Sequence, residues 1–113
     1  MVFVIVAVLT APVSAGALSG VELYQSCQDK KRGVGNIVCT AYIHGLVDGM
    51  TMGVASEKFP GKYCPPDSGI SAPQARLIIE KFLRDHPERL HVEAGLVAGL
   101  AIIEAFPCAT KSN

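Results

Sequence analysis

Four cysteines in a short chain constrain this sequence more than any other feature. The chain has 113 residues, which is one domain at most. Its cysteines are Cys27, Cys39, Cys64 and Cys108. An even number of cysteines favours disulfides if the chain is exported, whereas zinc ligands are typically clustered as Cys-x2-Cys, closer than any two cysteines here. The cysteines are therefore predicted to form two disulfides, and no metal or other cofactor is expected.

The first segment of the chain indicates export. Residues 1–17 carry no charge and consist of an apolar run followed by small residues. This run is shorter than the ~20 residues that span a bilayer, and Val13-Ser14-Ala15 and Ala15-Gly16-Ala17 both fit the small-x-small cleavage pattern. We therefore expect a signal peptide over 1–17 and a mature domain over 18–113, free of the membrane after cleavage. Because no Lys or Arg precedes the apolar run, an uncleaved anchor or an incorrectly placed start is the alternative.

Four cysteines allow three pairings, and helical geometry favours one of them. Cys27 and Cys39 flank the turn at 30–36 of an expected helical hairpin, so pairing them closes a short loop and leaves Cys64 for Cys108. The chain-entropy model assigns the short and the long loop roughly 3 and 4 kcal/mol of stability. Losing either disulfide should therefore lower the stability of a domain of this size by a large fraction.

Apolar periodicity and capping patterns predict an all-α fold, a compact four-helix domain. The patterns Ser19-x-x-Glu22 and Ser71-x-x-Gln74 are typical of helix starts. The expected helices are a short one that follows Ser19 and ends before Gln28, then about 36–57, 71–85 and 91–106. Three prolines and two glycines within 59–70 exclude a continuous helix there and predict a surface loop.

Small and charged residues at helical spacing give two packing expectations. The second helix carries a stripe of small residues, Ala41, Gly45, Gly49 and Gly53. The fourth helix carries a similar stripe, Ala94, Ala98, Ala101 and Ala105. Small residues allow two helices to approach closely, so these two are predicted to cross. In the third helix the buried face is expected to be Ala75, Ile78, Ile79, Phe82 and Leu83. Arg76, Glu80 and Arg84, four residues apart on the other side, are expected to be solvated.

Residues for catalysis or nucleic-acid binding are sparse. His44 and Asp48 stand four apart and could form a general-base pair or half of a metal site. No nucleophile or oxyanion motif accompanies them, and a metal would need His86 or His91 from a distant segment. A polar pair on a helix surface, or a buried Asp that accepts from helix-end amides, is the favoured interpretation. Ten Lys and Arg balance ten Asp and Glu, so the excess of positive charge typical of nucleic-acid binders is missing. The chain is predicted to be a binding protein rather than an enzyme.

Several motifs in a fixed order resemble one family. They are the segments CTAYIHGLVD at 39–48, YCPP at 63–66, HPERLH at 86–91 and AFPC at 105–108, together with Gln74. In this order they resemble the Rap/Tai family, small periplasmic immunity proteins against type VI secretion amidases. The resemblance covers about 18–108, with Ala41 standing where the family more often has Gly.

The resemblance implies an all-helical, disulfide-bonded, non-catalytic periplasmic protein that homodimerises and occludes the active site of a peptidoglycan amidase. The loop at 59–70 is the most exposed candidate for this contact, with an adjacent helix end as the other option. The candidate residues are Phe59, Lys62, Tyr63, Pro65, Pro66 and Asp67. One alternative is a structural or chaperone-like helper in the envelope, and another is an orphan relative with no toxin partner. An enzyme that depends on His44 is a third.

Overall fold

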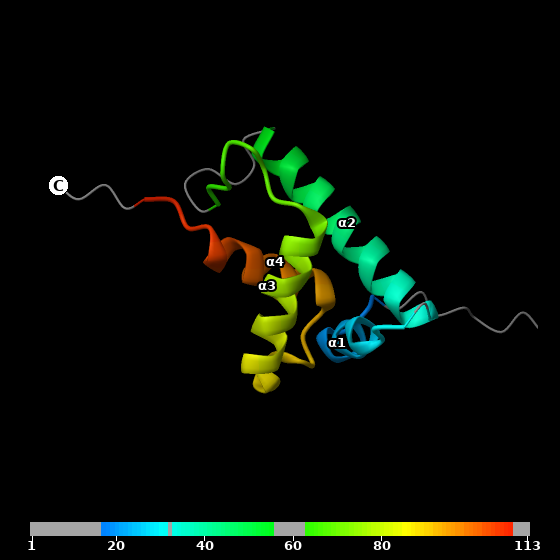
Figure 1. The fold of residues 1–113 in the computed structure, drawn as a ribbon. Coiled ribbons are helices and arrows are strands. Elements are labelled where there is room, and N and C mark those ends of the chain that lie inside the picture. Colours follow the sequence, from blue (N-terminus) through cyan, green and yellow to red (C-terminus); the bar gives the residue numbers. More distant parts are fainter. Residues whose placement is uncertain (1–16, 32, 56–62, 110–113) are drawn as a thin grey trace, which may run out of the picture.

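The computed structural model describes residues 17–31, 33–55 and 63–109, and these residues form a four-helix domain (Figure 1). The helices are α1 (Gly20–Gln28), α2 (Val34–Ala55), α3 (Ala72–Asp85) and α4 (Ala94–Ala105), with a short 3-10 helix η1 (Pro87–Arg89) before α4. Within these ranges no β-strand occurs, apart from one isolated bridge between Ser19 and Glu93. The predicted all-α class is confirmed, as are both predicted disulfides, Cys27–Cys39 and Cys64–Cys108.

The two predicted capping patterns begin α1 and α3. The Ser19 hydroxyl accepts a hydrogen bond from the Glu22 amide, and the Glu22 carboxylate accepts one from the Ser19 amide. The Ser71 hydroxyl accepts in the same way from the Gln74 amide, with Pro73 in the first turn. These bonds satisfy amides that have no partner within the helix, which is why both helices begin where the sequence predicted.

The start of α4 is later than predicted, at Ala94 rather than residue 91. The backbone just before α4 instead accepts hydrogen bonds from the first residues of α1. Gly20 donates to the carbonyl of Val92 at 2.7 Å, and Val21 donates to that of Leu90 at 2.8 Å. A Cβ at Gly20 would lie 3.1 Å from the Leu90 carbonyl oxygen, so glycine permits this close approach.

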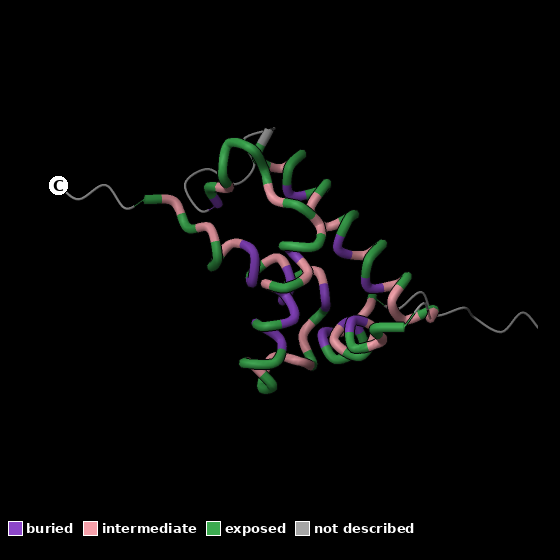
Figure 2. The backbone as a smooth tube through the Cα atoms, in the orientation of Figure 1, coloured by how far each residue is buried: buried purple, intermediate pink, exposed green. Residues whose placement is uncertain are grey.

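The buried residues lie on the sides of the helices that face one another (Figure 2). The core that they form contains the Cys27–Cys39 disulfide. Both of its cysteines are fully buried, as are Leu23 of α1 and Ile79 of α3. The predicted inner face of α3 is confirmed for Ala75, Ile79, Phe82 and Leu83, while Ile78 is half-buried. The disulfide links α1 covalently to α2 within the core.

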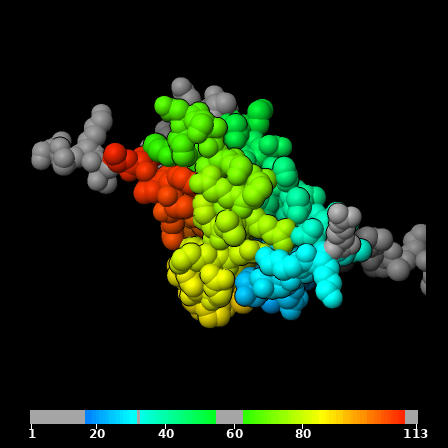
Figure 3. All heavy atoms as spheres, in the orientation of Figure 1, coloured from blue at the N-terminus to red at the C-terminus, as the bar shows by residue number. Residues whose placement is uncertain are grey.

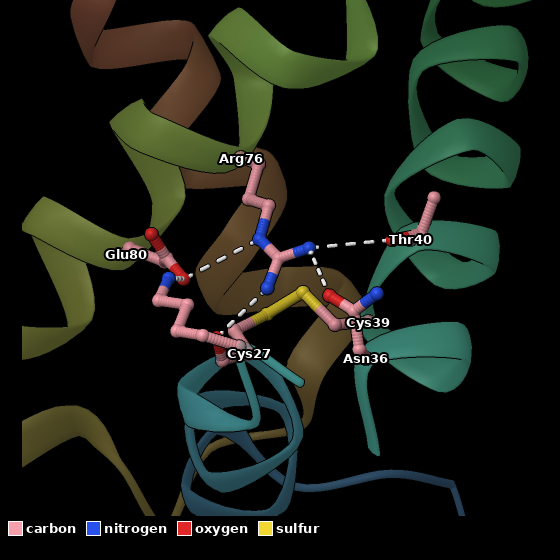
Figure 4. The surroundings of a disulfide bond; sticks show 7 residues. Cys27, Asn36, Cys39, Thr40, Arg76 and Glu80 are labelled. Atoms are coloured by element: carbon pink, nitrogen blue, oxygen red, sulfur yellow. Dashed lines mark hydrogen bonds and ion pairs between the residues drawn. A yellow bond between two sulfur atoms is a disulfide. The ribbon is translucent and has the colours of Figure 1, made fainter. Parts of the chain in front are cut away.

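The predicted solvated stripe on α3 is wrong at Arg76 and Glu80. The Arg76 guanidinium reaches from α3 to the junction of α1 and α2 (Figure 4). It donates to the Cys27 carbonyl at 2.8 Å, to the Asn36 amide oxygen at 2.8 Å and to the Thr40 hydroxyl at 3.3 Å. Arg76 therefore joins three helices beside the buried disulfide. Arg84, the third residue of the predicted stripe, is exposed as expected.

Glu80 completes this junction as a buried charge. Its residue exposure is 8%, and its carboxylate accepts from Arg76 Nε at 3.4 Å and from Lys30 Nζ at 2.6 Å. A buried carboxylate is tolerated when it is paired and hydrogen-bonded, which both cations provide. We call the group formed by Lys30, Asn36, Thr40, Arg76 and Glu80 the Arg76 junction.

The predicted close crossing of α2 and α4 is also wrong. A Cβ at Gly45 or Gly49 would meet no atom within 4 Å, and both residues are exposed. The alanines at 94, 98 and 101 are buried, but α4 packs mainly against α3 and α1. The glycine face of α2 is left open because the Cys27–Cys39 disulfide and the Arg76 junction hold the other side of α2 against α1 and α3.

Much of α2 is exposed in spite of its apolar composition. By length and composition, Val34–Val54 could cross a membrane, although a core helix of a soluble protein passes the same criterion. Two of its polar side chains bond to Arg76, and Cys39 ties it to α1. Val34, Ile37 and Met52 are each more than 60% exposed. This surface is therefore available for contact with another molecule.

Candidate functional site

The loop at 63–70 lies at the opposite end of the domain from α1, where α2 ends and α3 begins (Figure 1). The Cys64–Cys108 disulfide fastens it to the segment that follows α4. The Cys64 amide also donates to the Phe106 carbonyl at 3.0 Å. In the space-filling view the loop and the described residues that follow α4 lie side by side at this end (Figure 3). Two chain segments distant in sequence thus form one continuous surface.

A tight turn gives the loop its shape. The Gly69 amide donates to the Pro66 carbonyl at 2.8 Å, and Gly69 has a φ of +74°. This conformation strongly favours glycine, because other residues place Cβ too close to the backbone. Pro65 and Pro66 fix two further φ angles before the turn. The described part of the predicted loop is therefore preorganised by its own sequence.

The predicted contact residues fall into three groups. Phe59 and Lys62 lie outside the described residues. Pro66 and Asp67 are exposed at the tip of the loop, and Pro65 is half-buried. Tyr63 is 6% exposed and belongs to the core, where burial raises the pKa of its phenol above the ordinary value. Of the predicted contact residues that the structure describes, Pro66 and Asp67 are thus exposed and Tyr63 is buried.

A pocket of about 240 Å³ lies between this loop and the last turns of α2. The residues that line it are mostly apolar: Thr51, Val54, Tyr63, Pro65, Pro66, Asp67, Gly69 and Ile70. Asp67 is the one charged residue among them. The pocket is large enough for a side chain from a partner protein, and the acidic group at its rim favours a basic or hydrogen-bond-donating neighbour.

A larger apolar groove of about 410 Å³ separates α2 from α4. Its lining contains no charged residue and consists of Leu46, Met50, Gly95, Leu96, Gly99, Leu100 and Ile103. Leu96 is 67% and Leu100 37% exposed. The sequence displays the two stripes of small residues on α2 and α4 and the ridge of Leu96, Leu100 and Ile103 on α4. It does not indicate that α2 and α4 would be separated by a groove, because helical periodicity defines an apolar face but not the element that packs against that face.

His44 and Asp48, the candidate general-base pair, are both exposed on α2. Of the residues described, no three or more among His, Cys, Asp and Glu come together as metal ligands would. The four cysteines are all committed to disulfides. In the described ranges, neither a cluster of metal ligands nor a free cysteine therefore accompanies His44 and Asp48.

Comparison with known proteins identifies a family. Residues 19–108 match the family of Rap1a immunity proteins, which covers α1 through Cys108 and all four cysteines. No curated protein and no solved structure matches the chain. The match includes the capping serine of α1, the Arg76 junction and both ends of the loop disulfide. The chain belongs to the Rap1a immunity protein family.

Proposed function

We propose that this protein is a periplasmic immunity protein that binds a peptidoglycan amidase delivered by type VI secretion and occludes its active site. Membership of an immunity family supports a protein partner, and the motifs at 39–48 and 105–108 support the amidase class through the Rap/Tai resemblance. Two disulfides support an oxidising compartment. The apolar segment at 1–17 is the proposed signal peptide.

The observation that carries the proposal is the preorganised loop at 63–70. Inserting a loop into a cleft normally costs conformational entropy, and a loop already fixed in shape loses less. Here the disulfide, two prolines and the turn at Gly69 fix the loop before any partner arrives. Exposed Pro66 and Asp67 then stand where they can enter a cleft and exclude substrate.

The direct test starts with the partner itself. The oxidised mature domain serves as bait in an envelope extract, with its reduced and alkylated form as control. Captured material is assayed for cleavage of peptidoglycan cross-bridge peptides, and the amidase so identified is titrated with the domain. Stoichiometric inhibition supports the proposal; binding without loss of amidase activity contradicts it.

The loop makes a specific prediction for this titration. Asp67→Arg reverses a charge at the rim of the pocket and should weaken inhibition at least 10-fold, since charge reversal at an interface typically costs more than 1.4 kcal/mol. Far-UV circular dichroism and the unfolding midpoint should stay unchanged, because Asp67 is exposed. Arg84→Glu, an equal charge reversal at the exposed far end of α3, is the matched control and should inhibit like the wild type. Equal inhibition by both variants would exclude this loop as the contact.

A homodimer is a second part of the proposal, supported by the apolar groove between α2 and α4. We propose that a second copy covers this groove, because its lining is apolar on both walls and the glycines on the α4 wall, Gly95 and Gly99, allow close packing. Leu96→Glu should then shift the protein toward monomer by at least 10-fold in dissociation constant, measured by sedimentation or light scattering. Leu77→Glu on α3 is the control, since Leu77 is similarly exposed at 69% but lies outside the groove. A monomeric wild type at high micromolar concentration would rule the dimer out.

The same exposed apolar surface favours one rival function, an envelope helper that binds many clients. Such a helper should bind unfolded polypeptides weakly through the groove, without saturable one-to-one inhibition of an amidase. A Leu96→Glu variant that loses client binding while the amidase titration shows no inhibition would support the helper and not the immunity protein.

A further inference from the structure

The two disulfides differ sharply in exposure. Cys27 and Cys39 are both 0% exposed, and the Arg76 guanidinium bonds to the Cys27 carbonyl beside them (Figure 4). Cys64, in contrast, is exposed, and Cys108 is half-buried. One disulfide is therefore sealed inside the core and the other lies at the surface.

This difference decides which bond a reductant can reach. Thiol–disulfide exchange begins when a thiolate attacks one sulfur of the disulfide, so the rate depends on access to that sulfur. A protein or small dithiol can approach Cys64 in the folded state. It can approach Cys27 or Cys39 only after the core opens, which requires much of the folding free energy.

The exposed disulfide also controls the candidate contact surface. It joins the first residues of the loop at 63–70 to the segment after α4, across 44 residues of sequence. Cys64 and Cys108 lie outside the core cluster, although the neighbouring Tyr63 belongs to it. The sealed disulfide and the Arg76 junction, which join α1, α2 and α3, lie elsewhere, so these helices do not depend on the exposed disulfide directly. Opening it would release the loop while leaving the helical body folded.

We propose that the Cys64–Cys108 disulfide is a redox-sensitive latch that sets the shape of the partner-binding loop, opened selectively by a dithiol reductant. This regulation rests on the proposed immunity function. In the exchange, a thiolate of the reductant attacks one sulfur, the Cys64–Cys108 bond breaks, and the departing sulfur takes up a proton. The second thiol of the reductant then resolves the mixed disulfide, so the reductant is oxidised and both cysteines are reduced.

The chemical part of the proposal is tested on the isolated mature protein. It is incubated with dithiothreitol under native conditions, quenched at intervals with iodoacetamide, and mapped by peptide mass spectrometry. Cys64 and Cys108 should become alkylated at least 10-fold faster than Cys27 and Cys39. Equal rates, or faster alkylation of Cys27 and Cys39, would overturn the latch.

The structural part uses the half-reduced protein and a paired variant, Cys64→Ala with Cys108→Ala. Amide hydrogen exchange should accelerate at least 10-fold within 63–70, while the amides of α1 and the first half of α2 keep their protection. Far-UV circular dichroism should show the helices retained. Unchanged exchange in the loop, or loss of helix throughout, would contradict a latch that acts on the loop alone.

The regulatory part compares inhibition of the captured amidase by the oxidised and the half-reduced protein. Inhibition should weaken at least 10-fold when the latch is open. If the oxidised protein does not inhibit, the immunity function fails, while the alkylation rates and hydrogen exchange still decide the latch. If both forms inhibit equally, the immunity function stands and the regulatory role of the latch is wrong.

Discussion

Replacing Arg76 with Met is expected to lower the free energy of unfolding by about 3–4 kcal/mol. The variant keeps the aliphatic length of the side chain but removes hydrogen bonds to the Cys27 carbonyl, Asn36 and Thr40. It also removes one of the two cations that neutralise the buried Glu80 carboxylate. An under-compensated buried charge is costly, which makes this the largest effect expected from a single side chain outside the apolar core.

Urea unfolding followed by circular dichroism measures this loss. Arg84→Met is the matched control: it makes the same change on the same helix at an exposed residue, and should alter stability by less than about 0.5 kcal/mol. The double variant Arg76→Met with Glu80→Met should recover part of the loss, since it removes the buried charge as well. A loss below about 1 kcal/mol in the single variant would show that the Arg76 junction does not hold the three helices together.

Removing the Cys27–Cys39 disulfide is the second large effect. The paired variant Cys27→Ala with Cys39→Ala is expected to lose about 4 kcal/mol of stability, of which about 3 kcal/mol comes from closure of the short loop in the unfolded chain. The remainder comes from lost packing, because both cysteines are fully buried in the core. Alanine is preferred to serine here, since a buried hydroxyl without a partner would add its own cost.

The exposed disulfide provides the comparison. Its paired alanine variant, at Cys64 and Cys108, is expected to lose about 2 kcal/mol. This disulfide closes a longer loop, so its removal gives the unfolded chain more entropy. Its removal also frees an exposed segment in the native state, however, and the entropy that the native state gains offsets part of that loss of stability. Thermal or urea unfolding of the two variants under oxidising conditions measures the difference. A larger loss from the surface pair than from the core pair would contradict this ranking.

The sequence by itself determined where the helices begin, how the cysteines pair and where the loop lies. Helix starts at Ser19 and Ser71 follow from local hydrogen bonds, which depend on residues only three positions apart. The pairing of Cys27 with Cys39 follows from a hairpin turn that brings them together. The loop position follows from its prolines and from Gly69. Each of these depends on short-range chemistry that a sequence displays directly.

Only the tertiary structure decided which helix faces meet. Arg76 and Glu80 have the spacing of a solvated ion pair, yet they lie at a junction of three helices because α1 and α2 approach that side of α3. The glycines of α2 have the spacing of a packed stripe, yet Gly45 and Gly49 face open space. Helical periodicity specifies that a face exists, while the rotation of each helix against its neighbours depends on the sum of all core contacts. For that reason the groove between α2 and α4, and the difference in exposure between the two disulfides, became visible only in the assembled fold.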